Sequence, residues 1–293
     1  MNSTLADLLR AGPVVLDGAW GTQLQQKGLA PGECPDGWNL THPDRVREVA
    51  MAYVEAGSRV ILTNTFGANR IALSRHNLVA DSATINKAGA AISLQAAKGK
   101  ALVFGSMGPC GRLLLSGDVT EQEIEGAFGE QARALKEAGV HGIVVETMSD
   151  LAEAEIAVGA AHETGLPVVA CMSFDSGQAS DRTMMGVTPE QAADELRKAG
   201  ADAVGANCGL GIEGYLPLCV RLRAATNLPL WIKPNAGTPE LVDGAVTYRT
   251  GVKEFVERSG RLLDAGANFI GGCCGTTPAF ISALADLVKQ RAA

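Results

Sequence analysis

Short apolar runs recur along the chain, and each follows the end of a helix-like stretch. Residues 55–62, 137–144, 198–204 and 264–270 repeat this pattern, as EAGSRVIL, EAGVHGIV, KAGADAV and DAGANFI. Glycine is the usual residue just past a helix end, where the backbone turns left-handed. Apolar strands that do not alternate with polar residues are typical of a parallel sheet covered on both faces. The pattern therefore predicts repeated βα units.

Eight strands are expected in all, at about residues 13–17, 59–63, 102–106, 142–146, 167–172, 202–206, 229–233 and 268–271. Helices are expected between them, with starts at Pro43, Thr120, Ser149, Thr188-Pro189 and Thr277-Pro278. Long connections follow the first strand, at about 18–42, and the seventh, at about 234–250; such loops are often functional. Eight βα units over this length predict an α/β fold, a single (β/α)₈ TIM barrel with its site at the C-terminal mouth.

Composition narrows the class of protein. Hydrophobic residues make up 46% of the chain and charged residues 19%, which is sufficient for a large core. We find no linker or change of composition, so we expect one barrel domain over residues 1–293. The net charge of −7 offers no basic surface for nucleic acid. No apolar run reaches the roughly 18 to 20 residues of a membrane span, and the N-terminus lacks signal-peptide features. Seven cysteines without an export signal indicate reduced thiols, so we expect a cytoplasmic protein.

Three of the cysteines follow predicted strands in glycine-rich segments, GANCG at 205–209 and GGCCGTTP at 271–278. Because parallel barrel strands end at one mouth, we expect Cys208, Cys273 and Cys274 to meet there. Three thiolates with no fourth protein ligand in the motif indicate a catalytic zinc with an open position. The other four cysteines are expected to be small buried hydrophobic residues: Cys34, Cys110, Cys171 and Cys219.

Polar residues also follow the predicted strands. Asp17 comes after Val14-Val15-Leu16, and Glu146 comes after an apolar run, so both carboxylates are expected at the mouth. Each acid either binds a ligand or caps the next turn, since Asp-Gly is a common turn pair. The same choice between a site role and a turn role applies to Asp175. A set of asparagines at strand ends either orients ligands or satisfies loop backbone: Asn64, Asn207 and Asn235.

These cysteine segments, with DGAWGT at 17–22, TNTFG at 63–67, ET at 146–147, MSFD at 172–175 and NAG at 235–237, resemble the zinc-dependent homocysteine S-methyltransferase family. That family includes the homocysteine-binding module of cobalamin-dependent methionine synthase, betaine–homocysteine methyltransferase and S-methylmethionine–homocysteine methyltransferase. The resemblance runs from about residue 14 to 278. It implies an enzyme that transfers a methyl group to the zinc-bound thiolate of homocysteine, giving methionine. It also implies that Asp17 and Glu146 hold the substrate amino group, and that Gly18, Thr63 and Ser106 contact the substrate.

A three-cysteine zinc site suits a thiol substrate. A free thiol, with a pKa near 8.5, is only a few per cent ionised at pH 7, whereas zinc binding deprotonates it. Full ionisation across about 1.5 pK units is worth roughly 2 kcal/mol. The three thiolates also keep the bound sulfur electron-rich, and a three-histidine site would instead favour hydroxide formation.

The methyl donor stays open, as betaine, S-methylmethionine or the methyl group of a separate corrinoid protein. Trp20, Trp38 and the Trp38-Asn39 pair resemble the betaine-type bacterial members, in which an aromatic ring suits a quaternary ammonium through cation–π contact. Residues 39–44 (NLTHPD) instead resemble the methionine synthase module. The two tryptophans have core or lid packing as their alternative role. We find no Asp-x-His-x-x-Gly corrinoid motif in the chain.

Two other classes of protein also stay open. The first is an aldolase- or isomerase-type barrel acting on a phosphorylated substrate, for which Lys233 is the candidate Schiff-base lysine. The second is a non-catalytic, zinc-stabilised binding module, which predicts a closed fourth ligand.

Overall fold

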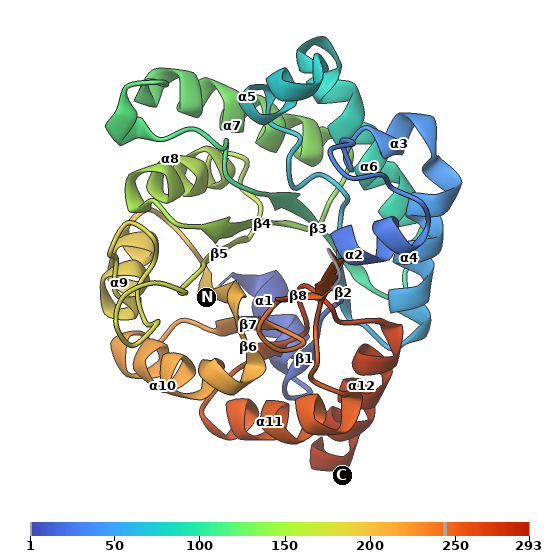
Figure 1. The fold of residues 1–293 in the computed structure, drawn as a ribbon, viewed down its shortest axis with the longest axis vertical. Helices are drawn as coiled ribbons and strands as arrows, with labels where there is room; N and C mark the ends of the chain where they lie inside the picture. The colour runs from blue at the N-terminus through green and yellow to red at the C-terminus, as the bar shows by residue number, and fades with distance from the viewer. Residues whose placement is uncertain (1, 243–244, 293) are drawn as a thin grey trace.

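The computed structural model describes residues 2–242 and 245–292. Its main sheet has eight strands in the order β1-β10-β7-β6-β5-β4-β3-β2, and every neighbouring pair is parallel. A parallel bridge between Leu16 and Val60 joins the first strand to the last, so the sheet closes on itself. Helices surround this ring (Figure 1). The predicted TIM barrel is confirmed.

The barrel strands lie where the apolar runs predicted them. They are β1 (Val14–Val15), β2 (Val60–Leu62), β3 (Leu102–Met107), β4 (Gly142–Met148), β5 (Val168–Met172), β6 (Ala203–Gly211), β7 (Leu230–Asn235) and β10 (Phe269–Ile270). The long connection after β7 holds an antiparallel hairpin of β8 (Glu240–Val242) and β9 (Ala245–Thr247). The long connection after β1 holds two short helices, α2 (Gly21–Gln26) and α3 (Trp38–Thr41).

Long helices form the outer ring: α4 (Pro43–Glu55), α6 (Ser82–Ala97), α7 (Glu121–Glu137), α8 (Leu151–His162), α9 (Pro189–Lys198), α10 (Tyr215–Ala225), α11 (Val252–Asp264) and α12 (Pro278–Ala292). Short helices complete the chain: α1 (Ser3–Leu9), α5 (Arg70–Leu73), and the 3₁₀ turns η1 (Ser74–His76), η2 (Val79–Asp81), η3 (Leu114–Ser116) and η4 (Ile212–Gly214). In the described part of the chain, none of the helices has both the length and the apolar character to cross a membrane.

Capping residues explain where several helices begin. Thr120 and Thr188 each form a capping box with the side chain three residues later, as their sequences indicate. The predicted start at Ser149 is displaced by one residue, because Asp150 caps α8 by accepting from the backbone N–H of Ala152. The other predicted starts agree with α4 and α12.

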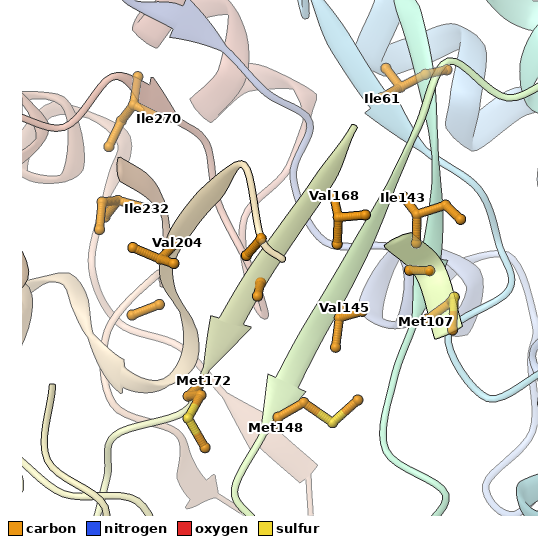
Figure 2. Close-up of a cluster of buried hydrophobic side chains, with 14 of the residues drawn as sticks. Ile61, Met107, Ile143, Val145, Met148, Val168, Met172, Val204, Ile232 and Ile270 are labelled. Atoms are coloured by element: carbon orange, nitrogen blue, oxygen red, sulfur yellow. The ribbon is translucent and has the colours of Figure 1, made fainter. Parts of the chain in front are cut away.

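The core has two layers, one on each side of the strands. Outward-facing strand residues such as Ile61, Ile143 and Ile232 pack beneath the helices (Figure 2). Inward-facing residues form a second cluster with Leu5 and Leu8 of α1. Since α1 directly precedes β1, it closes the N-terminal end of the barrel, and Figure 1 shows it at the centre of the ring.

The inward face turns polar toward the other end. Side chains of a strand alternate between its two faces, so residues two places apart share the barrel interior. Phe104, Val144 and Trp231 belong to the inner apolar cluster. Two places later on the same strands come Ser106, Glu146 and Lys233. These three residues line one cavity at the C-terminal mouth.

Candidate metal centre and substrate pocket

Three thiols meet at the mouth. The Sγ atoms of Cys208, Cys273 and Cys274 all lie within 4.8 Å of one another, and those of Cys208 and Cys274 are 3.9 Å apart. A tetrahedral zinc with bonds of about 2.3 Å would separate two sulfurs by roughly 3.8 Å, so this spacing fits the ion. Among the residues that the structure describes, no further His, Cys, Asp or Glu atom joins the group. The cysteine cluster therefore has the ligands and spacing to hold a metal with a position left open.

Cys208 is held by an unusual backbone. Its φ is +59°, and that of the following Gly209 is +60°, so two successive residues adopt the left-handed region. Non-glycine residues rarely do so, and such conformations are concentrated at functional sites. The Tyr215 hydroxyl donates to the Cys208 carbonyl at 2.7 Å, which stabilises this turn. The thiol is thereby directed toward the other two cysteines instead of along the strand.

Backbone hydrogen bonds fix the other two cysteines to the end of β7. The Cys273 N–H donates to the Pro234 carbonyl at 2.8 Å, and the Ala236 N–H donates to the Cys274 carbonyl at 3.0 Å. The Thr276 hydroxyl also donates to the Cys273 carbonyl at 2.7 Å. Hydrogen bonds to the main chain thus place all three cysteines, with Tyr215 and Thr276 donating from their side chains.

The thiol cluster favours one ionised sulfur. Hydrogen bonds from Cys208 and Cys273, with a further one from Tyr248, lower the pKa of Cys274 to about 3. Hydrogen bonding to its two neighbours, together with burial, raises the pKa of Cys273 well above its usual value. An anionic sulfur beside two further thiols is a suitable starting point for binding a dication.

The cysteines form one wall of a cavity of about 530 Å³. Its lining also contains four of the other predicted site residues: Gly18, Thr63, Ser106 and Glu146. A cavity of this size is in the range of small-molecule sites. The lining also includes Asp36, Arg75 and His76, which the sequence did not indicate, and Phe66 of the TNTFG segment. The cavity is therefore larger than a single amino acid requires.

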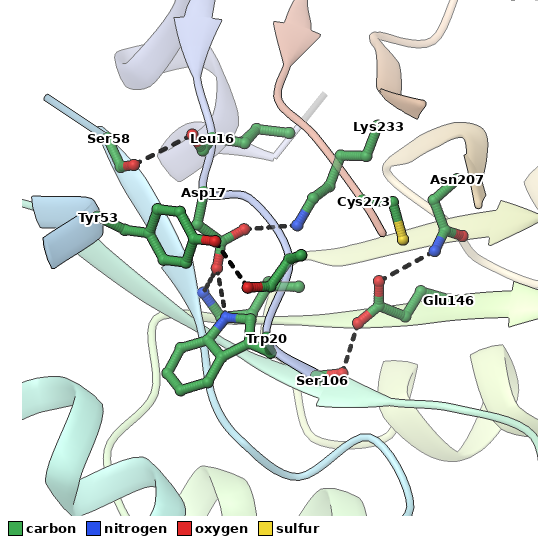
Figure 3. A network of polar contacts seen from close by, with 12 residues as sticks. Leu16, Asp17, Trp20, Tyr53, Ser58, Ser106, Glu146, Asn207, Lys233 and Cys273 are labelled. Atoms are coloured by element: carbon green, nitrogen blue, oxygen red, sulfur yellow. Dashed lines mark hydrogen bonds and ion pairs between the residues drawn. The ribbon is translucent and has the colours of Figure 1, made fainter. Parts of the chain in front are cut away.

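Glu146 presents a buried carboxylate to this cavity (Figure 3). It is 7% exposed, accepts from the Ser106 hydroxyl at 2.5 Å through Oε1, and accepts from Asn207 Nδ2 at 3.2 Å through Oε2. Burial raises the pKa of Glu146, while the nearby Lys233 partly opposes that shift. Asn207 therefore orients a site residue as well as satisfying loop backbone, because its Oδ1 accepts from the Thr147 N–H.

Asp17 also lies at the mouth, but this chain already uses both of its oxygens. Oδ1 lies 2.5 Å from Lys233 Nζ, and Oδ2 accepts from Trp20 Nε1 at 2.8 Å and from the Leu62 N–H at 2.7 Å (Figure 3). The residue is fully buried and is not part of the cavity lining. Asp17 thus ties together three strands, β1, β2 and β7.

Lys233 was not predicted to have this partner. Burial alone would lower its pKa, but the charges of Asp17 and Glu146 outweigh that effect and raise it. A Schiff-base lysine needs a neutral amine, so the ion pair argues against the aldolase-type alternative.

The remaining candidates have identifiable contacts. Gly18 lies close to Tyr53 and Thr276, since a Cβ there would lie 2.8 Å from atoms of each. The Thr63 hydroxyl accepts from the Ser106 N–H at 3.0 Å, which links β2 to β3. Trp38 is buried, and its Nε1 donates to Glu33 at 2.6 Å. Trp38 is therefore a packing residue, whereas Trp20 lines the cavity.

Asp175, Asn64 and Asn235 make turn and loop contacts, and Asn64 also lines the cavity. Asp175 is exposed and accepts from the neighbouring Ser176 hydroxyl at 2.9 Å, as a turn acid does. Asn64 and Asn235 donate to backbone carbonyls, those of Pro35 and Gly209. The four remaining cysteines are buried and free, as predicted: Cys34, Cys110, Cys171 and Cys219. Cys34 additionally reaches the cavity wall.

Comparison with known proteins identifies a family whose model covers all of these site residues. A family model described as homocysteine S-methyltransferase matches residues 14–288. The methionine synthase of Mycobacterium tuberculosis is 30% identical over 308 residues, covering 99% of this chain and 26% of that protein. The methionine synthase of Mycobacterium leprae is 28% identical, covering 99% of this chain and 25% of its own length. The chain thus spans about a quarter of these relatives. The metallated form of the homocysteine methyltransferase MmuM from Escherichia coli has a similar fold, with a TM-score of 0.81, 23% identity, and coverage of 97% of this chain and 99% of that one.

Proposed function

This chain belongs to the homocysteine S-methyltransferase family, and from that premise we propose that it transfers a methyl group to the sulfur of homocysteine, giving methionine. The observation that carries this proposal is the group of three thiols, with Sγ atoms within 4.8 Å of one another, on the wall of a cavity that also contains Glu146. Thiol ligands and a carboxylate together match the two ends of a thiol amino acid. The barrel, with residues 1–293 as one domain, holds the whole of this site.

We propose zinc as the resident metal, held by Cys208, Cys273 and Cys274. Soft thiolate ligands favour zinc over magnesium or calcium. Bound zinc would supply one thing, namely ionisation of the substrate thiol near neutral pH. The spacing of the three thiols supports this role, since their Sγ atoms all lie within 4.8 Å of one another.

The protein's own residues supply recognition and exclude water. Glu146 is placed to pair with the substrate ammonium, with Ser106 and Asn207 holding its two oxygens in position. Gly18, Thr63 and Ser106 provide the cavity surface around the amino acid. The buried walls remove solvent, which strengthens each charge interaction within the site.

The part of the cavity near Phe66, Arg75 and His76 leaves room for a methyl donor. The donor is either a small molecule such as betaine or S-methylmethionine, or a methyl group brought by a separate corrinoid protein. Seven free cysteines suit a reducing compartment, and we propose the cytoplasm as the site of action.

The test is a methionine-forming assay on zinc-loaded protein. Homocysteine is supplied with betaine, S-methylmethionine, S-adenosylmethionine or methylcobalamin in turn, and methionine is followed by chromatography. We expect one donor to give methionine, and zinc removal by a chelator to abolish it. Methionine formation that persists in fully zinc-free protein would contradict the mechanism. Binding of homocysteine, measured by calorimetry without any donor, checks the acceptor half independently.

A further inference from the structure

Lys233 places a buried cation in the substrate cavity. Its side chain is 3% exposed and lines the same cavity as Glu146 and Cys273. An ammonium group has three N–H donors, and the ion pair with Asp17 uses one of them. Among the described residues, 2–242 and 245–292, Asp17 Oδ1 is the one acceptor for Lys233 Nζ. Two donors therefore remain for a ligand that enters the cavity.

The charges around Lys233 indicate what that ligand group is. Asp17 forms an ion pair with Lys233 at 2.5 Å, which holds the lysine ammonium at a fixed place on the cavity wall. Glu146 has no ion-pair partner among the described residues and so offers its charge to a cation in the cavity. An α-amino acid brings both an ammonium and a carboxylate, and a buried carboxylate without a cationic partner is costly. Lys233 lines the same cavity as Glu146, and its two remaining N–H donors can hydrogen-bond the ligand's carboxylate.

We propose that Lys233 binds the α-carboxylate of homocysteine, and that Asp17 positions Lys233 instead of binding the substrate ammonium. This inference rests on the proposed function and refines it. Both oxygens of Asp17 already accept hydrogen bonds, from Lys233, Trp20 and Leu62. Asp17 is also absent from the cavity lining, whereas Lys233 and Glu146 are both part of it. The ammonium is thus left to Glu146 alone.

A structural role for Lys233 is the competing explanation, because the ion pair joins residues 216 positions apart in the chain. A lysine that only braces β1 against β7 would affect every ligand equally. A lysine that binds the carboxylate affects only ligands that have one. The two roles therefore differ in which thiols respond to substitution.

The experiment measures the affinity of zinc-loaded protein for three thiols by calorimetry. They are homocysteine, 3-aminopropane-1-thiol, which lacks the carboxylate, and 4-mercaptobutanoate, which lacks the ammonium. We expect Lys233→Met to weaken homocysteine binding about ten- to hundredfold, the usual range for a charge-assisted hydrogen bond, and to change 3-aminopropane-1-thiol binding less than about twofold. Glu146→Gln should give the complementary result, with 4-mercaptobutanoate least affected.

Two variants control for damage to the fold. Lys233→Met alone leaves Asp17 as an unpaired buried charge, so the Asp17→Asn, Lys233→Met double variant removes both charges together. It should keep its zinc and show the same selective loss of homocysteine affinity. Lys100→Met, at an exposed site in the turn before β3, is the matched surface control and should bind all three thiols as the wild type does.

Equal weakening of homocysteine and 3-aminopropane-1-thiol in the double variant would overturn the inference. So would a wild-type protein that binds these two thiols equally well. Either result leaves homocysteine as a ligand, so the proposed function survives. A zinc-loaded wild type that binds none of the three thiols would instead refute the proposed function, and the role of Lys233 with it.

Discussion

The two ends of the barrel are built by the same strands but have opposite contents. At the N-terminal end, Trp231 stacks near Phe104 and Phe269, with ring centroids 6.0 and 5.0 Å away, and α1 covers them. At the mouth, two residues further along β7 and β3, the chain places Lys233 and Ser106. A distance of two residues along a strand therefore separates the apolar inner cluster from the polar residues that line the cavity.

The difference shows that residues near the start of a strand stabilise the fold, whereas residues near its end form the site. The inner apolar layer supplies burial free energy and a rigid base. The mouth holds buried polar groups, which cost free energy unless they are partnered. Ser106, Glu146 and Lys233 each lie on a strand two positions beyond a packed residue, so the strands hold these site residues in place. Substitutions at the two ends should therefore have separable effects.

The largest effect is expected at the thiols. Cys273→Ala removes one of three ligands and should lose most of the bound metal and most methyl transfer, since two sulfurs hold zinc poorly. Cys171→Ala is the matched change lower in the barrel, at a buried cysteine of the inner cluster, and should keep its metal at a modest packing cost. Zinc per chain is measured by atomic emission. Full zinc in purified Cys273→Ala protein would refute the metal assignment.

Substitutions at the N-terminal end of the barrel, which α1 covers, should change the stability of the fold and not the site. Leu5 is fully buried in the inner cluster beneath the strands. We expect Leu5→Ala to lower the free energy of unfolding by about 2 to 5 kcal/mol, through lost burial and a residual cavity. Urea unfolding measures this loss, and zinc content and homocysteine affinity should stay unchanged in the folded protein. A change in homocysteine affinity larger than the loss of stability would show that the two ends are coupled.

Glu146→Gln should have an intermediate effect, which concerns substrate binding and leaves the metal and the fold unchanged. Loss of a charge-assisted hydrogen bond should weaken homocysteine binding by about 1.5 to 3 kcal/mol while metal is retained. The wild type should also show a pH effect: burial raises the pKa of Glu146, so binding is complete above that pKa and falls as the pH drops through it. Calorimetric titrations at several pH values check both statements. An acid limb identical in wild type and Glu146→Gln would exclude Glu146 as the group responsible.

The smallest effect is expected in the outer ring of helices. Arg221 of α10 pairs with Glu190 of α9 at 2.7 Å and lowers the pKa of Glu190 to about 2. A depressed carboxylate pKa stabilises the fold above the ordinary value of 4.5, and this contribution disappears as the pH falls toward 2. Because Glu190 is largely exposed, Glu190→Gln should cost less than about 1 kcal/mol at neutral pH. Thermal melts at pH 7 and pH 3 measure the difference, and a larger loss would show that the helix ring contributes more than solvent-screened pairs do.

The strands and the cysteine cluster were predictable because their signals are local. An apolar run such as 142–146 specifies a buried strand by itself, and GGCCG specifies where two thiols lie on that strand's loop. The ion pair of Asp17 with Lys233 was not predictable in this way, since its partners are 216 residues apart and only barrel closure brings them together. Tyr215 and Tyr248 were missed for the same reason: one lies on a helix and one on a loop, and their contacts with the cysteines arise from packing. The start of α8 was misplaced because Asp150, and not Ser149, provides the cap.

The contact between the loops after β1 and β10 can form only late in translation, because it joins residues from the two ends of the barrel sequence. The Gly272 N–H donates to the Asp17 carbonyl at 3.0 Å, so the first strand's loop and the last strand's loop complete each other. Asp17 and Cys273 are 256 residues apart by number (273 − 17), which at about 5 to 20 residues per second is a delay of roughly 10 to 50 s during translation. After Cys208 is synthesised, a further 65 residues (273 − 208) must be added before Cys273 exists. During that time Cys208 has neither of the other two cysteines of the metal site beside it. We therefore expect metal capture to be a late event of synthesis, and stalled nascent chains ending before β10 to retain no zinc.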